Sequence, residues 1–238
     1  MKKIILSFLA ALSIASCQSS KETNLNITGN VDGLKKGGLY LEKYSVADSS
    51  FKSLDSIRIN GDAHFHFETY IDEPQIMFLR LDDNSGDENQ EIIKFFAEAG
   101  DYDIQTKMKN FSNKVKIETT SKNQLKYEEY NDMIDKFNNK NLDLIAAGLK
   151  VDDTNDKNQV LIDSLSFQYN SLLKRKYLYT VNFAVNNKDL EVSPYVTVAE
   201  VYDANVKYLD TIYKTLNRKV RKSLYGKELK ELIELRKE

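Results

Sequence analysis

The chain has 238 residues, of which 41% are hydrophobic and 29% are charged, enough to bury the core of one or two domains. Its formal charge of −2 argues against nucleic-acid binding, which needs a clustered basic footprint. A single cysteine excludes an internal disulfide and a Cys-x-x-Cys redox centre.

Residues 1–16 have the pattern of a secretory signal peptide. Two lysines precede an apolar stretch at 4–15, which is too short to cross a hydrocarbon core of about 30 Å. Small residues then lead to Cys17, and Ile14-Ala15-Ser16-Cys17 resembles the lipobox of bacterial lipoproteins. That resemblance implies cleavage before Cys17 and acylation of its thiol and its new amino group. The alternative is a plain signal peptide with a coincidental cysteine.

Lipidation of Cys17 predicts a protein held in the cell envelope, with the outer membrane as the expected site, on its periplasmic face or at the cell surface. Several acyl chains, at about 0.8 kcal/mol per buried methylene, anchor a protein more firmly than one chain does. The exported part then has no thiol, so its stability must come from packing. The polar residues 17–23 predict a short flexible tether.

Residues 24–119 alternate between apolar and polar side chains in short runs separated by Gly, Asp and Asn. This pattern predicts a mostly antiparallel β-sandwich-like domain or a partly open barrel. Asn60-Gly61-Asp62 predicts a tight hairpin turn, and Gly100-Asp101 marks another. The expected strands are 24–31, 38–44, 54–60, 63–70, 75–82, 91–97, 101–107 and 114–118.

Both histidines of the chain, His64 and His66, lie in one of these strands. Successive side chains of a strand point to opposite faces, so the polar residues share one face and the phenylalanines share the other. The polar face could bind Zn²⁺ with a third ligand from a neighbouring strand, or it could be the solvated face of a half-buried strand. We favour the solvated face, because no other histidine and no exported cysteine remains to complete the ligand set. We therefore predict no metal site.

From residue 120 to residue 238 glycine becomes rare and the apolar spacing changes to three or four, which predicts a helical domain. Ser193-Pro194 resembles an N-cap followed by proline at the first helical position. Helices are expected at about 194–217, with a break near Asn205, and at 226–237. Residues 151–156 supply N-cap candidates for an earlier helix. Two apolar stripes are predicted to pack, one of Tyr127, Tyr130, Ile134 and Phe137 and one of Leu161, Leu165, Tyr169 and Leu172. The expected fold class is α+β.

Three further segments each allow two interpretations. The acidic loop 81–89 could bind calcium, but Gly86 occupies a ligand position of the EF-hand register, so we favour a solvated loop. The basic stretch 214–227 could meet an anionic lipid, an acidic glycan or an acidic partner, but we favour a solvated helix face balanced by nearby glutamates. Several tyrosines could line a sugar-binding groove, although packing is the favoured interpretation. They are Tyr177, Tyr179, Tyr195, Tyr202, Tyr208 and Tyr213.

Catalytic motifs are missing from the sequence. There is no Gly-x-Ser-x-Gly elbow, phosphate-binding loop or His-Glu-x-x-His pattern. The many carboxylates are compatible with a two-carboxylate glycosidase, yet Glu128-Glu129 and Asp152-Asp153 are expected on helix or linker surfaces. We predict that the protein is not an enzyme and has no cofactor.

With these residues in view, the chain resembles the Bacteroidetes lipoproteins that contain domain of unknown function 4369. The likeness is carried by ITGNV at 27–31, LYL at 39–41, DS at 55–56, NGDAHFHF at 60–67 and FAEAGD at 96–101. Downstream, SPY at 193–195, KYLD at 207–210 and SLYGK at 223–227 resemble the helical connector that leads into a thioredoxin-like disulfide reductase domain in many relatives. This chain ends at Glu238, where that domain would begin, so the resemblance does not imply reductase activity.

Three functions follow as hypotheses. The leading one is a lipid-anchored envelope protein that acts as a non-catalytic binding or interaction module for a protein partner. An alternative is an accessory module of a thioredoxin-like thiol-disulfide oxidoreductase system whose redox domain lies on another chain. A third is the capture of a glycan or peptide at the envelope.

Overall fold

The structure is a computed structural model that describes residues 22–45, 48–83, 91–151 and 158–237. The signal peptide expected at 1–16 and the lipidation site Cys17 lie outside these residues, so both stay predictions. Most of the acidic loop, residues 84–89, and the linker residues 152–156 also lie outside them.

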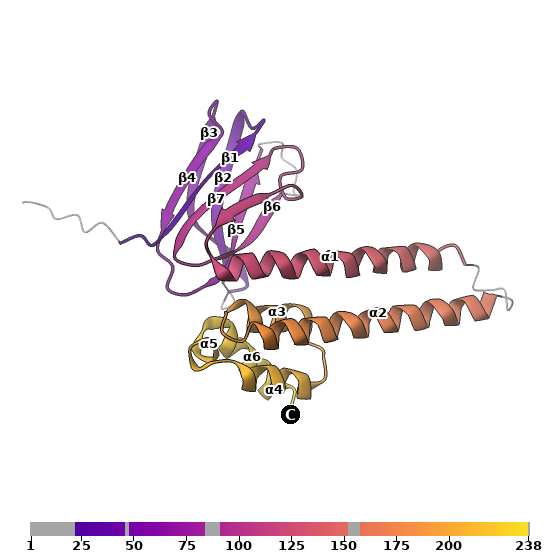
Figure 1. The fold of residues 1–238 in the computed structure, drawn as a ribbon. Coiled ribbons are helices and arrows are strands. Elements are labelled where there is room, and N and C mark those ends of the chain that lie inside the picture. Colours follow the sequence, from indigo (N-terminus) through magenta and orange to yellow (C-terminus); the bar gives the residue numbers. More distant parts are fainter. Residues whose placement is uncertain (1–21, 46–47, 84–90, 152–157, 238) are drawn as a thin grey trace, which may run out of the picture.

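Eight strands form two four-stranded sheets that pack face to face (Figure 1). The first sheet has the order β4-β1-β7-β8 and the second has the order β3-β2-β5-β6. All neighbouring strands are antiparallel except β1 and β7, which are parallel. The predicted sandwich and its strands are confirmed. The strand bounds are β1 (Leu25–Asp32), β2 (Lys36–Ser45), β3 (Ser50–Asn60), β4 (His64–Thr69), β5 (Gln75–Asp82), β6 (Ile92–Ala97), β7 (Gly100–Lys107) and β8 (Lys116–Thr119).

The core of the sandwich is built by the alternation seen in the sequence. Leu25, Ile27 and Val31 of β1 are buried, as are Phe65 and Phe67 of β4. Burying one such apolar side chain stabilises the fold by about 1.5–3 kcal/mol. The sandwich therefore has an ordinary packed core.

The two predicted turns are corrected by the topology. Gly61 and Gly100 do have positive φ angles, 102° and 138°, which glycine adopts without a steric penalty. However, β3 and β4 belong to different sheets, and so do β6 and β7. Neither turn closes a hairpin; each carries the chain from one sheet to the other. Along its length β3 pairs with β2, and β4 pairs with β1 instead.

Two long helices follow the sandwich and run antiparallel to each other, and four shorter ones come after them (Figure 1). Ser121 caps the first helix, because its side chain accepts a hydrogen bond from the backbone N–H of Gln124. No helix in the described part of the chain combines the length and the apolar character needed to cross a membrane. The bounds are α1 (Lys122–Gly148), α2 (Gln159–Asn186), α3 (Val192–Glu200), α4 (Val206–Thr215), α5 (Arg218–Lys222) and α6 (Leu224–Leu235).

The far ends of α1 and α2 extend beyond the sandwich and beyond the four shorter helices (Figure 1). We call this part, residues 137–149 and 159–176, the arm; it includes Leu149, the C-cap of α1. The second predicted apolar stripe lies here and is only partly buried. Leu172 is buried, but Leu161 and Tyr169 are exposed. The expectation that this stripe would be covered is therefore wrong for those two side chains, because neither the sandwich nor the shorter helices extend alongside it.

The helix starts also differ from expectation. α3 begins at Val192 with Glu191 as its N-cap, and Ser193 donates its hydroxyl to the carbonyl of Ala184. Pro194 is thus the third residue of the helix, still within the first turn, where the N–H has no intrahelical partner. The predicted break near Asn205 is confirmed, since Asn205 caps α4.

An aromatic cluster joins the sandwich to the helices, and we call it the aromatic junction. It consists of Phe96, Tyr127, Tyr130, Tyr179, Phe183, Tyr195 and Tyr225. The ring centroids of neighbouring members are between 4.8 Å and 6.3 Å apart, within the range of favourable aromatic pairs. The hydroxyl of Tyr225 also accepts a hydrogen bond from the backbone N–H of Ile76 at 2.8 Å. Of the first predicted stripe, Tyr127, Tyr130 and Ile134 are buried here, and Phe137 is partly buried against them.

Candidate functional site

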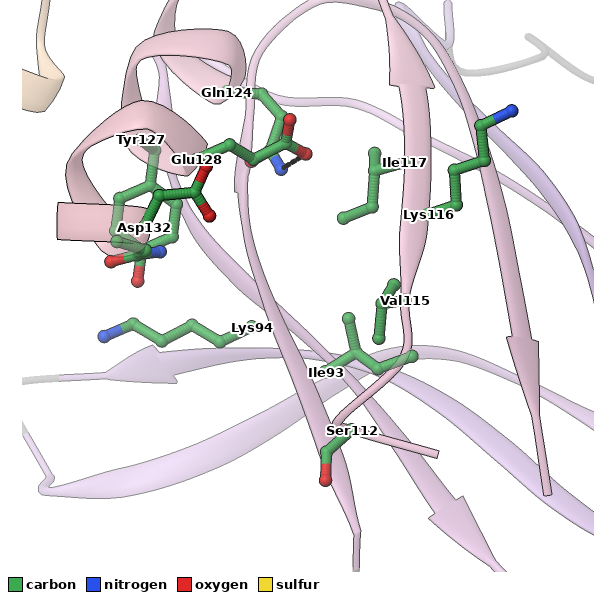
Figure 2. A pocket seen from close by; sticks show the side chains of 11 residues that line it. Ile93, Lys94, Ser112, Val115, Lys116, Ile117, Gln124, Tyr127, Glu128 and Asp132 are labelled. Carbon is green, nitrogen blue, oxygen red and sulfur yellow. Dashed lines mark hydrogen bonds between the residues drawn. The ribbon is translucent and has the colours of Figure 1, made fainter. Parts of the chain in front are cut away.

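A cleft of about 510 Å³ opens along one side of the sandwich, where both sheets end. β6 is the last strand of one sheet and β8 is the last strand of the other. The first turns of α1 form the third wall. Figure 2 shows the side chains that line the cleft, with Ile93, Val115 and Ile117 grouped between the strands. These three apolar side chains pack against the sandwich core and form the floor of the cleft.

The free edge of β6 faces the cleft. The backbone N–H of Phe96 points away from β5, because it donates to the side-chain oxygen of Gln124 on α1 at 2.7 Å. Backbone groups of a strand alternate in direction, so the N–H of Lys94 points to the same free edge. At the other end of the strand, Glu91 accepts a hydrogen bond from the backbone N–H of Ser112 at 2.9 Å. Gln124 and Ser112 therefore occupy the two ends of this strand edge, and the part between them, around Lys94, faces the cleft.

The side chain of Lys94 lies over two aromatic rings. Its ammonium nitrogen is 5.8 Å from the centroid of Tyr127 and 5.2 Å from that of Tyr195. Cations within about 6 Å of a ring centroid are attracted by the ring electrons. These contacts hold the charge at the mouth of the cleft, beside the α1 wall (Figure 2).

The α1 wall is fixed by a chain of hydrogen bonds. Gln124 accepts from Phe96 and donates to Glu128 at 2.8 Å, as the dashed line in Figure 2 marks. Asn123, which is almost completely buried, donates to Glu98 and Glu191 at 3.0 Å each. Because these bonds connect strand, helix and helical domain, the wall of the cleft is positioned before any ligand arrives.

The rim carries both signs of charge. Glu128 and Asp132 come from α1, while Lys94 and Lys116 come from the strands. Lys116 lies 2.5 Å from Glu118, and this hydrogen bond raises the pKa of Lys116. An apolar floor, a free strand edge and opposite charges on facing walls suit an extended peptide, which offers backbone groups, side chains and charges together.

The histidine strand lies at the other edge of the sandwich. β4 is an edge strand, Phe65 and Phe67 are buried, and both histidines are exposed, so the predicted two-faced strand is confirmed. His64 lies 2.7 Å from Asp62, and His66 lies 2.7 Å from Asn26. Within the residues that the structure describes, no group of three or more His, Cys, Asp or Glu side chains is placed to hold a metal ion.

The basic stretch 214–227 is partly used to build the fold. Lys219 lies 3.0 Å from the buried Glu191, and Lys214 lies 2.5 Å from Asp210. Arg221 donates to the backbone carbonyls of Leu216 and Lys214. These contacts favour the structural interpretation over a free anion-binding patch.

The six tyrosines considered for a sugar groove are not brought together. Tyr179 and Tyr195 belong to the aromatic junction. Tyr177 donates to Asp203, and Tyr202 and Tyr208 are exposed. Tyr213 packs against a separate buried cluster of the helical domain, so the six side chains lie in different environments.

The cleft was not predicted from the sequence. Its walls come from three segments that are separated along the chain, and each segment alone reads as ordinary strand or helix. Glu128 was expected on a helix surface, and it does lie on α1, but the cleft beside it depends on where the sandwich ends. The available signal was the short predicted strand 114–118 next to a helix start, which is typical of a sheet edge.

Residues 25–126 match the sequence model of a family described as Domain of unknown function (DUF4369). The match covers the whole sandwich and ends in the first turns of α1, so the strand walls of the cleft lie inside it. Among solved structures, transthyretin from Sparus aurata is similar, with 13% identity and a TM-score of 0.30, over 42% of this chain and 100% of that chain. A search among curated proteins finds none that matches this chain.

Proposed function

We propose that the protein is a lipid-anchored, non-catalytic module of the cell envelope that captures a short extended peptide segment of a partner protein in the cleft. The observation that carries this proposal is the free edge of β6 at Lys94, which faces an apolar floor. A peptide that adds to such an edge gains main-chain hydrogen bonds, and the floor selects its side chains.

The geometry also sets the length of the peptide. Ser112 and Gln124 flank the edge at its two ends, and Ile92 to Phe96 spans about 13 Å at 3.3 Å per residue. Such an edge pairs with about three to five residues of an added strand. The charges on facing walls then favour a peptide that carries both an acidic and a basic group.

The anchor supports this role. Acylated Cys17 would attach the protein to the outer membrane, and the following polar residues would keep the sandwich within a short reach of the lipid surface. A capture module held in this way meets segments of other envelope proteins rather than soluble substrates.

Binding is tested with the full chain and a library of short fluorescent peptides with alternating apolar residues, by fluorescence anisotropy. The best peptide is then remade with N-methyl groups on alternate residues, which keeps the side chains but removes backbone donors. The N-methylated peptide should bind at least about tenfold more weakly, the equivalent of 1.4 kcal/mol. Equal binding of the two peptides, or no binding by the library, contradicts the proposal.

A matched pair of variants locates the site. Ile117→Glu places a charge on the floor and should abolish binding, whereas Leu54→Glu places the same charge on β3, at the opposite edge of the sandwich, and should leave binding unchanged. Circular dichroism of both variants checks the fold. Equal losses in the two variants contradict the assignment.

The anchor is tested separately by growing cells with clickable palmitate. The chain should be labelled and its Cys17→Ser variant should not. Label that persists in Cys17→Ser, or an unlabelled parent chain, contradicts the anchor without affecting the cleft.

A further inference from the structure

The arm exposes an apolar stripe that nothing in the described part of the chain covers. Leu142, Ile145 and Leu149 are exposed to 61%, 49% and 83%. They recur at spacings of three and four along α1 and its C-cap Leu149, whose backbone is still helical, so they lie on one side of the helix. A stripe of this kind on a projecting helix pair is typical of a surface that packs against another helix.

Two hollows run between the helices of the arm and share Tyr169 in their linings. The inner one, about 220 Å³, is lined by Asn141 and Leu173, among others. The outer one, about 390 Å³, is lined by Leu144, Ile145, Leu165, Ser166, Tyr169 and Asn170. None of these six outer residues is charged. In the inner hollow the one charged residue, Lys176, is paired with Glu200 at 2.9 Å.

Asn141 adds an unsatisfied polar group to this surface. Its side-chain oxygen is buried and meets no hydrogen-bond donor among the described residues. A buried acceptor without a donor costs free energy. An asparagine in a helix interface commonly pairs with another asparagine and sets the register of the helices. Rotation of the Asn141 side chain toward the contact would let the same side chain of a second copy supply the missing donor.

We propose that this face of the arm binds the same face of a second copy, with the two arms antiparallel and the twofold axis near Asn141 and Tyr169. An uncharged face meets itself without like-charge repulsion, as an isologous contact requires. The two pairs of helices would form a four-helix arrangement. This contact is independent of the peptide-binding cleft.

The charges at the rim fit this arrangement. Asp163 lies six residues before Tyr169 on α2, and Lys174 lies five residues after it. At 100° per residue both are about 120–140° around the helix from Tyr169, on the same side. In an antiparallel pair centred on Tyr169, Asp163 of each copy therefore comes opposite Lys174 of the other.

The size of the contact predicts its strength. Twelve helical residues span about 18 Å and two helices are about 20 Å wide, which gives a footprint of roughly 400 Å² per copy. The total of roughly 800 Å² is below the 1,200 Å² of stable interfaces. We therefore expect a reversible dimer with a dissociation constant in the micromolar range or weaker.

Cysteine crosslinking tests the face. In the full chain with Cys17→Ser, a single Tyr169→Cys should form covalent dimers with a short bis-maleimide. Gln168→Cys is the matched control, because Gln168 lines a different hollow, with Lys140 and Arg175. The dimer should form at least about tenfold faster in Tyr169→Cys. Equal rates, or no dimer in either, would overturn the proposal.

A charge exchange tests the antiparallel register in the same Cys17→Ser chain, by sedimentation velocity over a concentration series. Asp163→Lys and Lys174→Asp should each raise the dissociation constant about tenfold, because each places like charges opposite each other twice per dimer. The double variant should return it to the parent value. A double variant as weak as the single ones would overturn the register.

Discussion

The near and far halves of the same two helices differ in what surrounds them. In the near half, Tyr130 and Phe183 are buried in the aromatic junction, with the sandwich on one side and α3 to α6 on the other. In the far half, Leu149 and Phe167 are largely exposed. Both halves carry apolar stripes at helical spacing, so a stripe shows which side of a helix is apolar and does not show whether this chain covers it.

The largest expected difference between the halves is how much their tyrosines make the free energy of unfolding depend on alkaline pH. Burial raises the pKa of Tyr130, Tyr195 and Tyr225 above the usual tyrosine value. The unfolded chain loses these protons at about pH 10, while the folded chain still holds them. The stabilising effect is thus fully present below about pH 10 and is lost as the pH rises further.

Urea unfolding at a series of pH values checks this effect. The free energy of unfolding should fall steeply above about pH 10, and Tyr195→Phe should make the fall shallower. An unchanged slope in Tyr195→Phe would show that this hydroxyl is not protected in the folded state.

Truncation of one side chain in each half gives the next largest effect. Tyr130→Ala removes a buried ring and its 2.7 Å hydrogen bond to Thr180, and should lower the free energy of unfolding by about 3–5 kcal/mol. Leu142→Ala in the arm should change it by less than about 0.5 kcal/mol. Dilute protein is used, so that pairing of arms does not contribute. Similar losses in both variants would mean that the arm is more tightly packed than its exposure indicates.

Replacing one glycine in each region by alanine compares how closely the backbone is packed in the two regions. A Cβ atom at Gly226 would lie 2.0 Å from the carbonyl oxygen of Val220, whereas one at Gly148, at the end of the arm, would meet nothing within 4 Å. Gly226→Ala should lower the free energy of unfolding by about 3 kcal/mol. Gly148→Ala should raise it by up to about 1 kcal/mol. Thermal unfolding followed by circular dichroism measures both, and a stable Gly226→Ala would contradict the tight approach of α5 to α6.

Among the destabilising changes in and around the junction, Tyr225→Phe should produce the smallest loss. The ring stays in the junction, but the buried N–H of Ile76 loses its acceptor, at a cost of about 1–2 kcal/mol. Hydrogen exchange should be faster at Ile76 and unchanged along the arm. Unchanged exchange at Ile76 would show that this bond contributes little.

The sequence predicted the positions of the strands better than it predicted which strands pair with each other. All eight strands lie close to their expected positions, because alternation is a local property. Gly61 and Gly100 were correctly identified as turn residues, yet the turns join different sheets. Turn chemistry determines how the chain bends, and the pairing of the flanking strands depends on contacts with segments far away in the sequence.

The candidate site was unpredictable for the same reason. Lys94 and Ile117 become neighbours of α1 only because β6 and β8 end their sheets on the same side of the sandwich. No spacing rule connects them. The two faces of the histidine strand were easier to predict. The burial of Phe65 and the exposure of His66 follow directly from alternation within one strand.

The parallel pairing of β1 with β7 has a consequence for how the chain is made. β1 leaves the ribosome early, but its second neighbour is far behind it: the partners Asn26 and Asp101 are 75 positions apart. Contacts at such separations form slowly, so the early chain stays open while the rest is synthesised. If the chain is exported as proposed, it must pass through a narrow translocation pore before it folds, and a central strand whose last partner arrives late would help to keep it unfolded until then.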